Sequence, residues 1–128
     1  MEDLSKPTQL DFVLLQVRNL EASKRFYHQT LHFPLVEYQN PEAVVFEDQQ
    51  GAVFAIRQPL TNLPDSGPLG LGTSLWFSWS GAIEKLHRYL QQEGVEVVKP
   101  PFDTPFGKSI VVADPDGYLL TFHQADHA

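Results

Sequence analysis

A strand runs into a helix within residues 17–27, VRNLEASKRFY, and this junction decides how the rest of the chain is interpreted. Residues 10–17 are apolar and rich in β-forming side chains, which predicts a strand. Asn19 is a suitable helix N-cap, and Glu21 falls in the first turn, where the helix dipole favours an acid. Apolar side chains then recur at helical spacing, so we expect a helix over residues 20–31 with one buried stripe.

Three short extended segments follow the expected helix. Turn signals separate them, Asn40-Pro41 between the first two and Gln49-Gln50-Gly51 between the last two. The segments are residues 34–38, 43–47 and 52–57. We therefore expect a strand–helix–strand–strand–strand module over residues 10–57.

The pattern begins again after residues 58–72, which hold three Pro and three Gly without periodicity and are predicted as a linker. The second set begins with a strand and a helix, which Ser80 or Gly81 caps and Gly94 ends. Its strands are residues 74–79, 95–98, 108–113 and 118–123. The repeat is offset by about 62 residues, so residues 73–124 are predicted as a second βαβββ module.

Two tandem modules predict a single α+β domain over residues 1–128. Each helix would pack on the outer face of its own sheet. The two mixed sheets would then curl around an open cup. A concave sheet surface of this kind is a natural small-molecule site.

Charge and composition limit the partners. The chain has 16 Asp and Glu against 9 Lys and Arg, a formal net charge of −7, which argues against nucleic acid and anionic membranes. This charge permits a cationic small ligand, although solubility alone also explains it. The absence of cysteine excludes disulfides, thiolate metal sites and a cysteine nucleophile. We find no secretory signal and no apolar run near the ~18 residues of a membrane span, so we expect a soluble, cytoplasmic protein.

Two motifs connect the chain to a known family. Residues 17–27 resemble the strand-to-helix junction of the vicinal-oxygen-chelate superfamily, with Asn19 where Asp is usual. Residues 114–120, DPDGYLL, resemble the turn before the last strand of that fold. The similarity covers residues 10–124. It implies the fold of glyoxalase I, the dioxygenases and the bleomycin-resistance proteins.

Metal-dependent members of this family place His, Gln or Glu on the first and last strands of each module, facing the cup. The resemblance puts these positions at Phe12, Ala55, Ser74 and Thr121. Phe12 and Ala55 have no donor atom, and neutral hydroxyls are poor substitutes for imidazole or carboxylate. We therefore expect no metal site and no other cofactor.

Two histidines on the first helix are a candidate metal pair of a different kind. His28 and His32 are four residues apart, a spacing that can bind a metal. No acidic third ligand is evident nearby, so we expect a structural role for both. His32 follows the helix where the family usually has Gly, which predicts a left-handed backbone there.

Strand alternation sorts the side chains that would face the cup. They are apolar and aromatic with a few polar groups, which suits a flat or partly apolar ligand. Together with Phe106, the predicted ligand-binding residues are Phe12, Leu14, Gln16, Arg57, Trp76, Ser78, Thr121 and His123. Leu75, Phe77 and Trp79 would face the helix instead. The alternative is that the large side chains close the cup as core and leave no pocket.

The second half resembles the bleomycin-resistance branch of the family. Residues 73–81, TSLWFSWSG, are similar to its tryptophan-bearing fifth strand, and residues 104–108, TPFGK, to its Pro-Trp-Gly loop, with Phe106 in place of Trp. The resemblance implies a metal-free homodimer that sequesters an antibiotic, cationic or aromatic, without any reaction. No catalytic residue is predicted, and the sequence favours a binding protein. The alternatives are a glyoxalase- or dioxygenase-type enzyme with a non-standard or metal-free site, and a structural or regulatory module with a filled cup.

Overall fold

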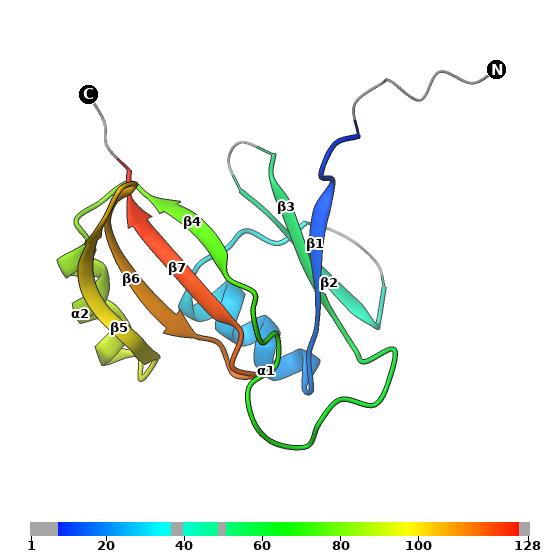
Figure 1. The fold of residues 1–128 in the computed structure, drawn as a ribbon. Coiled ribbons are helices and arrows are strands. Elements are labelled where there is room, and N and C mark those ends of the chain that lie inside the picture. Colours follow the sequence, from blue (N-terminus) through cyan, green and yellow to red (C-terminus); the bar gives the residue numbers. More distant parts are fainter. Residues whose placement is uncertain (1–7, 37–39, 49–50, 126–128) are drawn as a thin grey trace. The chain divides into compact units, whose positions relative to one another are not determined.

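The computed structural model describes residues 8–36, 40–48 and 51–125. The chain divides into two compact units, Met1–Leu60 and Thr61–Ala128, and the division falls within the segment predicted as a linker. Each unit carries one mixed sheet and one helical segment (Figure 1). The sheets have three and four strands, so the predicted α+β class is confirmed.

The first unit holds the three-stranded sheet, in the order β1-β3-β2. Its strands are β1 (Phe12–Gln16), β2 (Ala43–Glu47) and β3 (Val53–Arg57). β1 pairs parallel with β3, and β2 pairs antiparallel with β3. A parallel neighbour for the first strand requires a crossover connection, and the helical segment after β1 lies in that connection.

The helical segment of this unit has two parts. Helix α1 (Leu20–Lys24) begins at Asn19, whose Oδ1 accepts the Ala22 N–H at 3.0 Å, as predicted for the cap. It continues as the π-helical segment η1 (Arg25–Thr30), so the single α-helix expected over residues 20–31 is wrong in its second half. The Leu31 N–H donates to the Phe26 carbonyl five residues earlier, which widens the turn.

An aromatic cluster forms the core of the first unit. Tyr27 of η1 is fully buried, and its ring centroid lies 5.1–6.2 Å from those of Phe26, Phe33, Phe46 and Phe54. The two strand residues Phe46 and Phe54 are paired in register, so their rings emerge on the same face of the sheet. The helical segment therefore covers this face, and the alternate residues of each strand point to the other face.

The segment after the helix differs from the prediction. We expected a strand at residues 34–38, but its described part forms only an isolated bridge between Leu35 and Phe46, while residues 37–39 lie outside the described residues. Two predictions for the histidines are confirmed. His32 has a φ of 63°, and Nδ1 of His28 lies 2.9 Å from the Phe33 carbonyl, a structural bond that closes the end of the helix.

The second unit holds the four-stranded sheet, in the order β4-β7-β6-β5. Its strands are β4 (Leu75–Trp79), β5 (Glu96–Thr104), β6 (Gly107–Ala113) and β7 (Leu119–Gln124), with helix α2 (Ile83–Gln92) between the first two. β4 pairs parallel with β7, and the other pairs are antiparallel. β5 extends six residues beyond the strand predicted at 95–98, because an edge strand with register shifts can accommodate Pro100 and Pro101.

The start of α2 also differs from the prediction. Its N-cap is Ala82, with no side-chain cap bond, rather than Ser80 or Gly81. Instead, the Ile83 N–H donates to Oε1 of Gln124 at the end of β7, at 3.2 Å. A side chain from the sheet therefore satisfies a helix N-terminus that local sequence was expected to cap.

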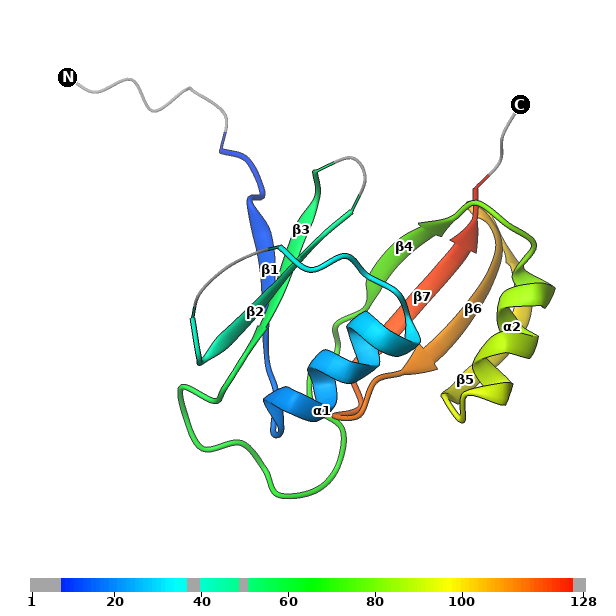
Figure 2. The same cartoon turned by 180° about the vertical axis from the view of Figure 1, so that it is seen from behind.

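Helix α2 covers one face of its sheet (Figure 2). Its buried residues Ile83, Leu86 and Leu90 meet a face that includes Leu120 and Phe122 of β7. No helix in the described part of the chain is long and apolar enough to cross a membrane. The opposite face of this sheet carries the alternate residues of β4 and β7.

Candidate ligand-binding site

The face of the second sheet away from α2 carries four of the predicted site residues. The parallel register pairs Trp76 with Thr121 and Ser78 with His123. Trp76 leaves 47% of its surface exposed, whereas Thr121 leaves 2%. Trp76 can therefore offer a ring to a ligand, and Thr121 lies beneath the surface as part of the floor.

Phe106 joins this face from the turn between β5 and β6. Its ring centroid lies 5.7 Å from that of Trp76 at an interplanar angle of 76°, an edge-to-face contact. The His123 ring lies 6.1 Å from Trp76 on the same surface. Because Phe106 is 66% exposed, the three rings form an accessible wall, which we call the aromatic wall (Trp76, Phe106 and His123).

The polar groups of the aromatic wall bond to one another. Nδ1 of His123 lies 3.2 Å from the Phe106 carbonyl oxygen, and Nε2 lies 3.3 Å from Oγ of Ser78. A carbonyl oxygen only accepts, so Nδ1 carries the proton and, in the neutral ring, Nε2 accepts from the Ser78 hydroxyl. Both ring nitrogens are thus engaged, and His123 links the turn at Phe106 to Ser78 of β4.

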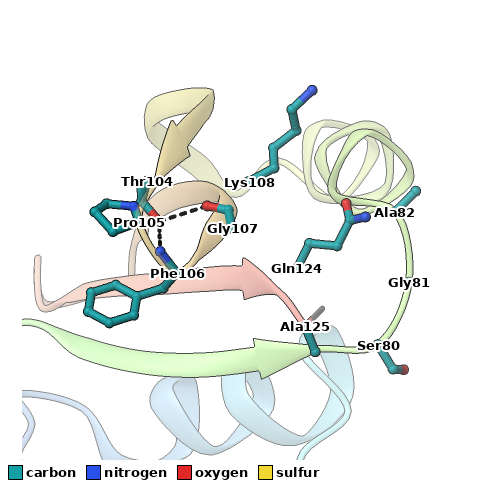
Figure 3. Close-up of a pocket in the computed structure, with 10 residues that line it drawn as sticks. All are labelled: Ser80, Gly81, Ala82, Thr104, Pro105, Phe106, Gly107, Lys108, Gln124 and Ala125. Carbon is teal, nitrogen blue, oxygen red and sulfur yellow. Dashed lines mark hydrogen bonds between the residues drawn. The ribbon is translucent and has the colours of Figure 1, made fainter. Parts of the chain in front are cut away.

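A hollow of about 690 Å³ opens at the hairpin that carries Phe106 (Figure 3). It is lined by residues 80–82 before α2, residues 104–108 of the β5–β6 hairpin, and Gln124 and Ala125 after β7. Of the predicted site residues, Phe106 alone lines it. Phe106 therefore belongs both to the aromatic wall and to the lining of the hollow.

One ion pair borders the hollow. Nζ of Lys108 lies 2.8 Å from Oε1 of Glu84. This hydrogen bond lowers the pKa of the Glu84 carboxyl and raises the pKa of the Lys108 ammonium. The cation that lines the hollow is therefore already balanced by a carboxylate.

The remaining predicted residues lie together on the open face of the first sheet. Phe12 and Leu14 are 47% and 42% exposed, and Gln16 pairs with Arg57 in register. Oε1 of Gln16 accepts the Leu60 N–H at 2.7 Å, while Nε of Arg57 donates to the Gln58 carbonyl at 3.0 Å. Gln16 and Arg57 therefore bond to the backbone of the segment that follows β3, whereas Phe12 and Leu14 stay accessible.

The four positions that the resemblance assigns to metal ligands do not fit a metal ion. In the first sheet, Ala55 pairs with Leu14 and so lies diagonally from Phe12, and neither residue has a donor. In the second sheet, Oγ of Ser74 lies 3.3 Å from Oγ1 of Thr121, so two neutral hydroxyls bond to each other. Divalent metal ions that bind His, Gln or Glu side chains are poorly held by neutral hydroxyls. Across the ranges that the structure describes, no group of three His, Asp or Glu could hold a metal.

Sequence reasoning missed the hollow. Thr104, Ser80 and Gln124 line it from three separate segments. The Pro105-Phe106-Gly107 turn could have indicated the hairpin that forms one side of the hollow. The position of Gln124 against the start of α2 depends on a contact between residues far apart in the chain.

Comparison with known proteins places this architecture in a family. Residues 9–122 match the group described as the Glyoxalase/Bleomycin resistance protein/Dioxygenase superfamily. The phenazine antibiotic resistance protein EhpR of Enterobacter agglomerans is 27% identical, over 94% of this chain and 95% of EhpR. Virulence protein STM3117 of Salmonella typhimurium is 29% identical, over 90% of this chain and 83% of its own length. The crystal structure of a glyoxalase-related enzyme from Fulvimarina pelagi aligns with a TM-score of 0.69 at 25% identity, covering 92% of this chain and 88% of that one. The chain therefore belongs to the glyoxalase, bleomycin resistance protein and dioxygenase superfamily.

Proposed function

We propose that this protein binds a planar aromatic antibiotic on the open face of its second sheet and sequesters it without chemical change. The exposed edge-to-face pair of Trp76 and Phe106 carries the proposal. A flat ligand would stack on one ring and meet the edge of the other, which is the geometry that aromatic groups prefer. Similarity to EhpR, which is named for resistance to phenazine antibiotics, supports tricyclic phenazines as the first ligands to test.

The side chains around the aromatic wall favour binding over catalysis. His123 is the titratable residue of β4 and β7, and both of its ring nitrogens bond to protein groups. The residues at the metal-ligand positions are Phe12, Ala55, Ser74 and Thr121, and these side chains do not support a Lewis acid. The aromatic wall therefore offers a ligand contact area and a complementary shape, not reactive groups.

A homodimer is part of this proposal. β1 and β4 each form an edge of their sheet in the described chain, and neither strand contains a charged residue. Uncharged edge strands are normally covered or paired, because their free backbone groups invite another strand. Sedimentation equilibrium should give the mass of two chains, and a monomer that persists at high concentration would contradict this part.

Calorimetric titration with a phenazine tests the ligand and the site. Wild type should bind, and Trp76→Ala should weaken binding about tenfold, the equivalent of about 1.4 kcal/mol for one lost aromatic contact. Trp79→Phe is the matched control, since Trp79 lies on the opposite face of the same strand. Equal affinity of Trp76→Ala and wild type would place the site elsewhere.

Mass spectrometry of the same mixture separates sequestration from catalysis. After prolonged incubation with the protein, the phenazine should be recovered with unchanged mass. A new product that depends on the protein would establish an enzyme and contradict the binding proposal. A glycopeptide of the bleomycin class, titrated in parallel, tests the cationic ligand that the net charge of −7 permits.

A further inference from the structure

The ring of Phe106 sits on a very short turn. β5 ends at Thr104 and β6 begins at Gly107, and these two residues pair with each other. Only Pro105 and Phe106 therefore join the two strands. An exposed ring on such a turn keeps a fixed position only if other groups hold the backbone on which it stands.

The Thr104 hydroxyl bridges both ends of this turn (Figure 3). It donates to the Gly107 carbonyl oxygen at 2.7 Å and accepts the Phe106 N–H at 3.1 Å. The hydroxyl has one proton, so these two bonds use its donor and one of its acceptor sites. A second hydroxyl supports the same carbonyl, because Oγ of Ser109 donates to Gly107 at 3.2 Å.

His123 holds the other side of Phe106. Its Nδ1 lies 3.2 Å from the Phe106 carbonyl oxygen, so the N–H and the C=O of Phe106 are both bonded to side chains, one from β5 and one from β7. Gly107 adds a steric limit, since a Cβ at this residue would lie 2.6 Å from the Gln124 carbonyl oxygen. The hairpin thus lies directly against the end of β7.

We infer that Thr104 and His123 are positioning residues that hold Phe106 against Trp76, so that ligand affinity depends on the Thr104 hydroxyl. The inference rests on the proposed function for its consequence in binding. A wall that is already ordered costs less conformational entropy when a ligand arrives. Releasing the turn would restore freedom to one large side chain, which corresponds to a loss of about two- to tenfold in affinity.

Two substitutions at residue 104 separate the hydroxyl from the shape of the side chain. Thr104→Val keeps the branched shape and removes the hydroxyl, whereas Thr104→Ser keeps the hydroxyl. Phenazine affinity should fall about two- to tenfold in Thr104→Val and return to near the wild-type value in Thr104→Ser. Equal affinities of the Val and Ser variants would overturn the inference.

A double-mutant cycle shows whether Thr104 acts through Phe106. Phe106→Ala alone should weaken phenazine binding. Adding Thr104→Val to it should cause no further loss, because the group being positioned is gone. The same loss from Thr104→Val with and without Phe106 would show that residue 104 acts by another route, and would overturn the inference.

A measurement without ligand keeps this inference apart from the proposed function. In a Trp79→Phe background, Trp76 is the one tryptophan left of the two. Acrylamide should quench its fluorescence more strongly in Thr104→Val than in Thr104→Ser, as Phe106 leaves the indole. If wild type binds no phenazine, the proposed function fails while quenching still decides the positioning role, and equal quenching would reject it.

Variants of His123, which contacts the Phe106 carbonyl oxygen, provide an independent check in case Thr104→Val does not fold. His123→Asn can place an amide N–H near the Phe106 carbonyl, whereas His123→Leu cannot donate. Quenching of Trp76 should rise in His123→Leu and stay closer to the wild-type level in His123→Asn. No difference between these two variants would contradict the role given to His123.

Discussion

Gly107 is the residue where the hairpin can be perturbed most sharply. Its φ is 113°, a backbone conformation that side chains rarely adopt. Holding a non-glycine residue in such a region costs on the order of 1–3 kcal/mol. Gly107→Ala would also place its methyl group 2.6 Å from the Gln124 carbonyl oxygen, closer than real Cβ contacts come, so a strand would have to move. Forced overpacking of this kind adds about 1–3 kcal/mol.

Gly72→Ala is the matched control for this change. Gly72 also has a positive φ, 83°, but nothing lies within 4 Å of the position of its missing Cβ. The control therefore contains the backbone strain without the clash. The difference between the two variants isolates the close approach of the hairpin to β7.

Urea denaturation followed by tryptophan fluorescence measures this difference. Both tryptophans lie on β4, in the unit that contains both glycines, so the signal follows the relevant unit. With a slope of about 2 kcal/mol per molar urea, the midpoint of Gly107→Ala should lie about 0.5–1.5 M below that of Gly72→Ala. Coincident midpoints would refute the packing of the hairpin on β7.

Three further changes test the core, a turn and a surface pair. Tyr27→Ala removes the centre of the first aromatic cluster and should cost about 3–5 kcal/mol, measured as a lower thermal midpoint by circular dichroism. Asp114→Ala leaves the N–H groups of Asp116 and Tyr118 without the carboxylate that accepts them, which should cost roughly 1–3 kcal/mol in urea, whereas Asp114→Asn keeps an acceptor and should cost less. The hydrogen bond with Lys108 lowers the pKa of Glu84 below its ordinary value of 4.5. The pair therefore stabilises the folded protein above pH 4.5, and this effect is lost as the pH falls through the lowered pKa. In a carboxyl NMR titration, Lys108→Met should move the pKa of Glu84 upward, and an unchanged value would contradict the pairing.

The face of each strand could be predicted from sequence because strand alternation is fixed by backbone geometry. Once the resemblance had placed Ser74 and Thr121 on the open face, Trp76 followed from Ser74 and His123 from Thr121 by parity. The register confirms that Trp76 and His123 share this face. The left-handed backbone at His32 was predicted from the resemblance, because the family usually has Gly at this position, and the φ of 63° confirms it.

Features that depend on contacts between distant residues could not be predicted from the sequence. The local signals at Ser80 and Gly81 indicated a helix cap, but Gln124, 41 residues beyond Ile83, provides the bond that caps α2. The second half of the first helix is π-helical, which the helical spacing of the apolar residues did not indicate. The expected strand at residues 34–38 is reduced, in its described part, to a single bridge at Leu35.

The two indole N–H resonances of the protein give the most direct test of the proposed binding surface. Trp76 lies on the open face of the second sheet, whereas Trp79 lies on the opposite face with its Nε1 atom buried. In a ¹⁵N-labelled sample titrated with a phenazine, the Trp76 indole signal should shift strongly because of the stacked ring, and the Trp79 signal should stay near its starting position. A shift confined to Trp79, or no shift of Trp76 at saturating ligand, would contradict aromatic binding at this wall.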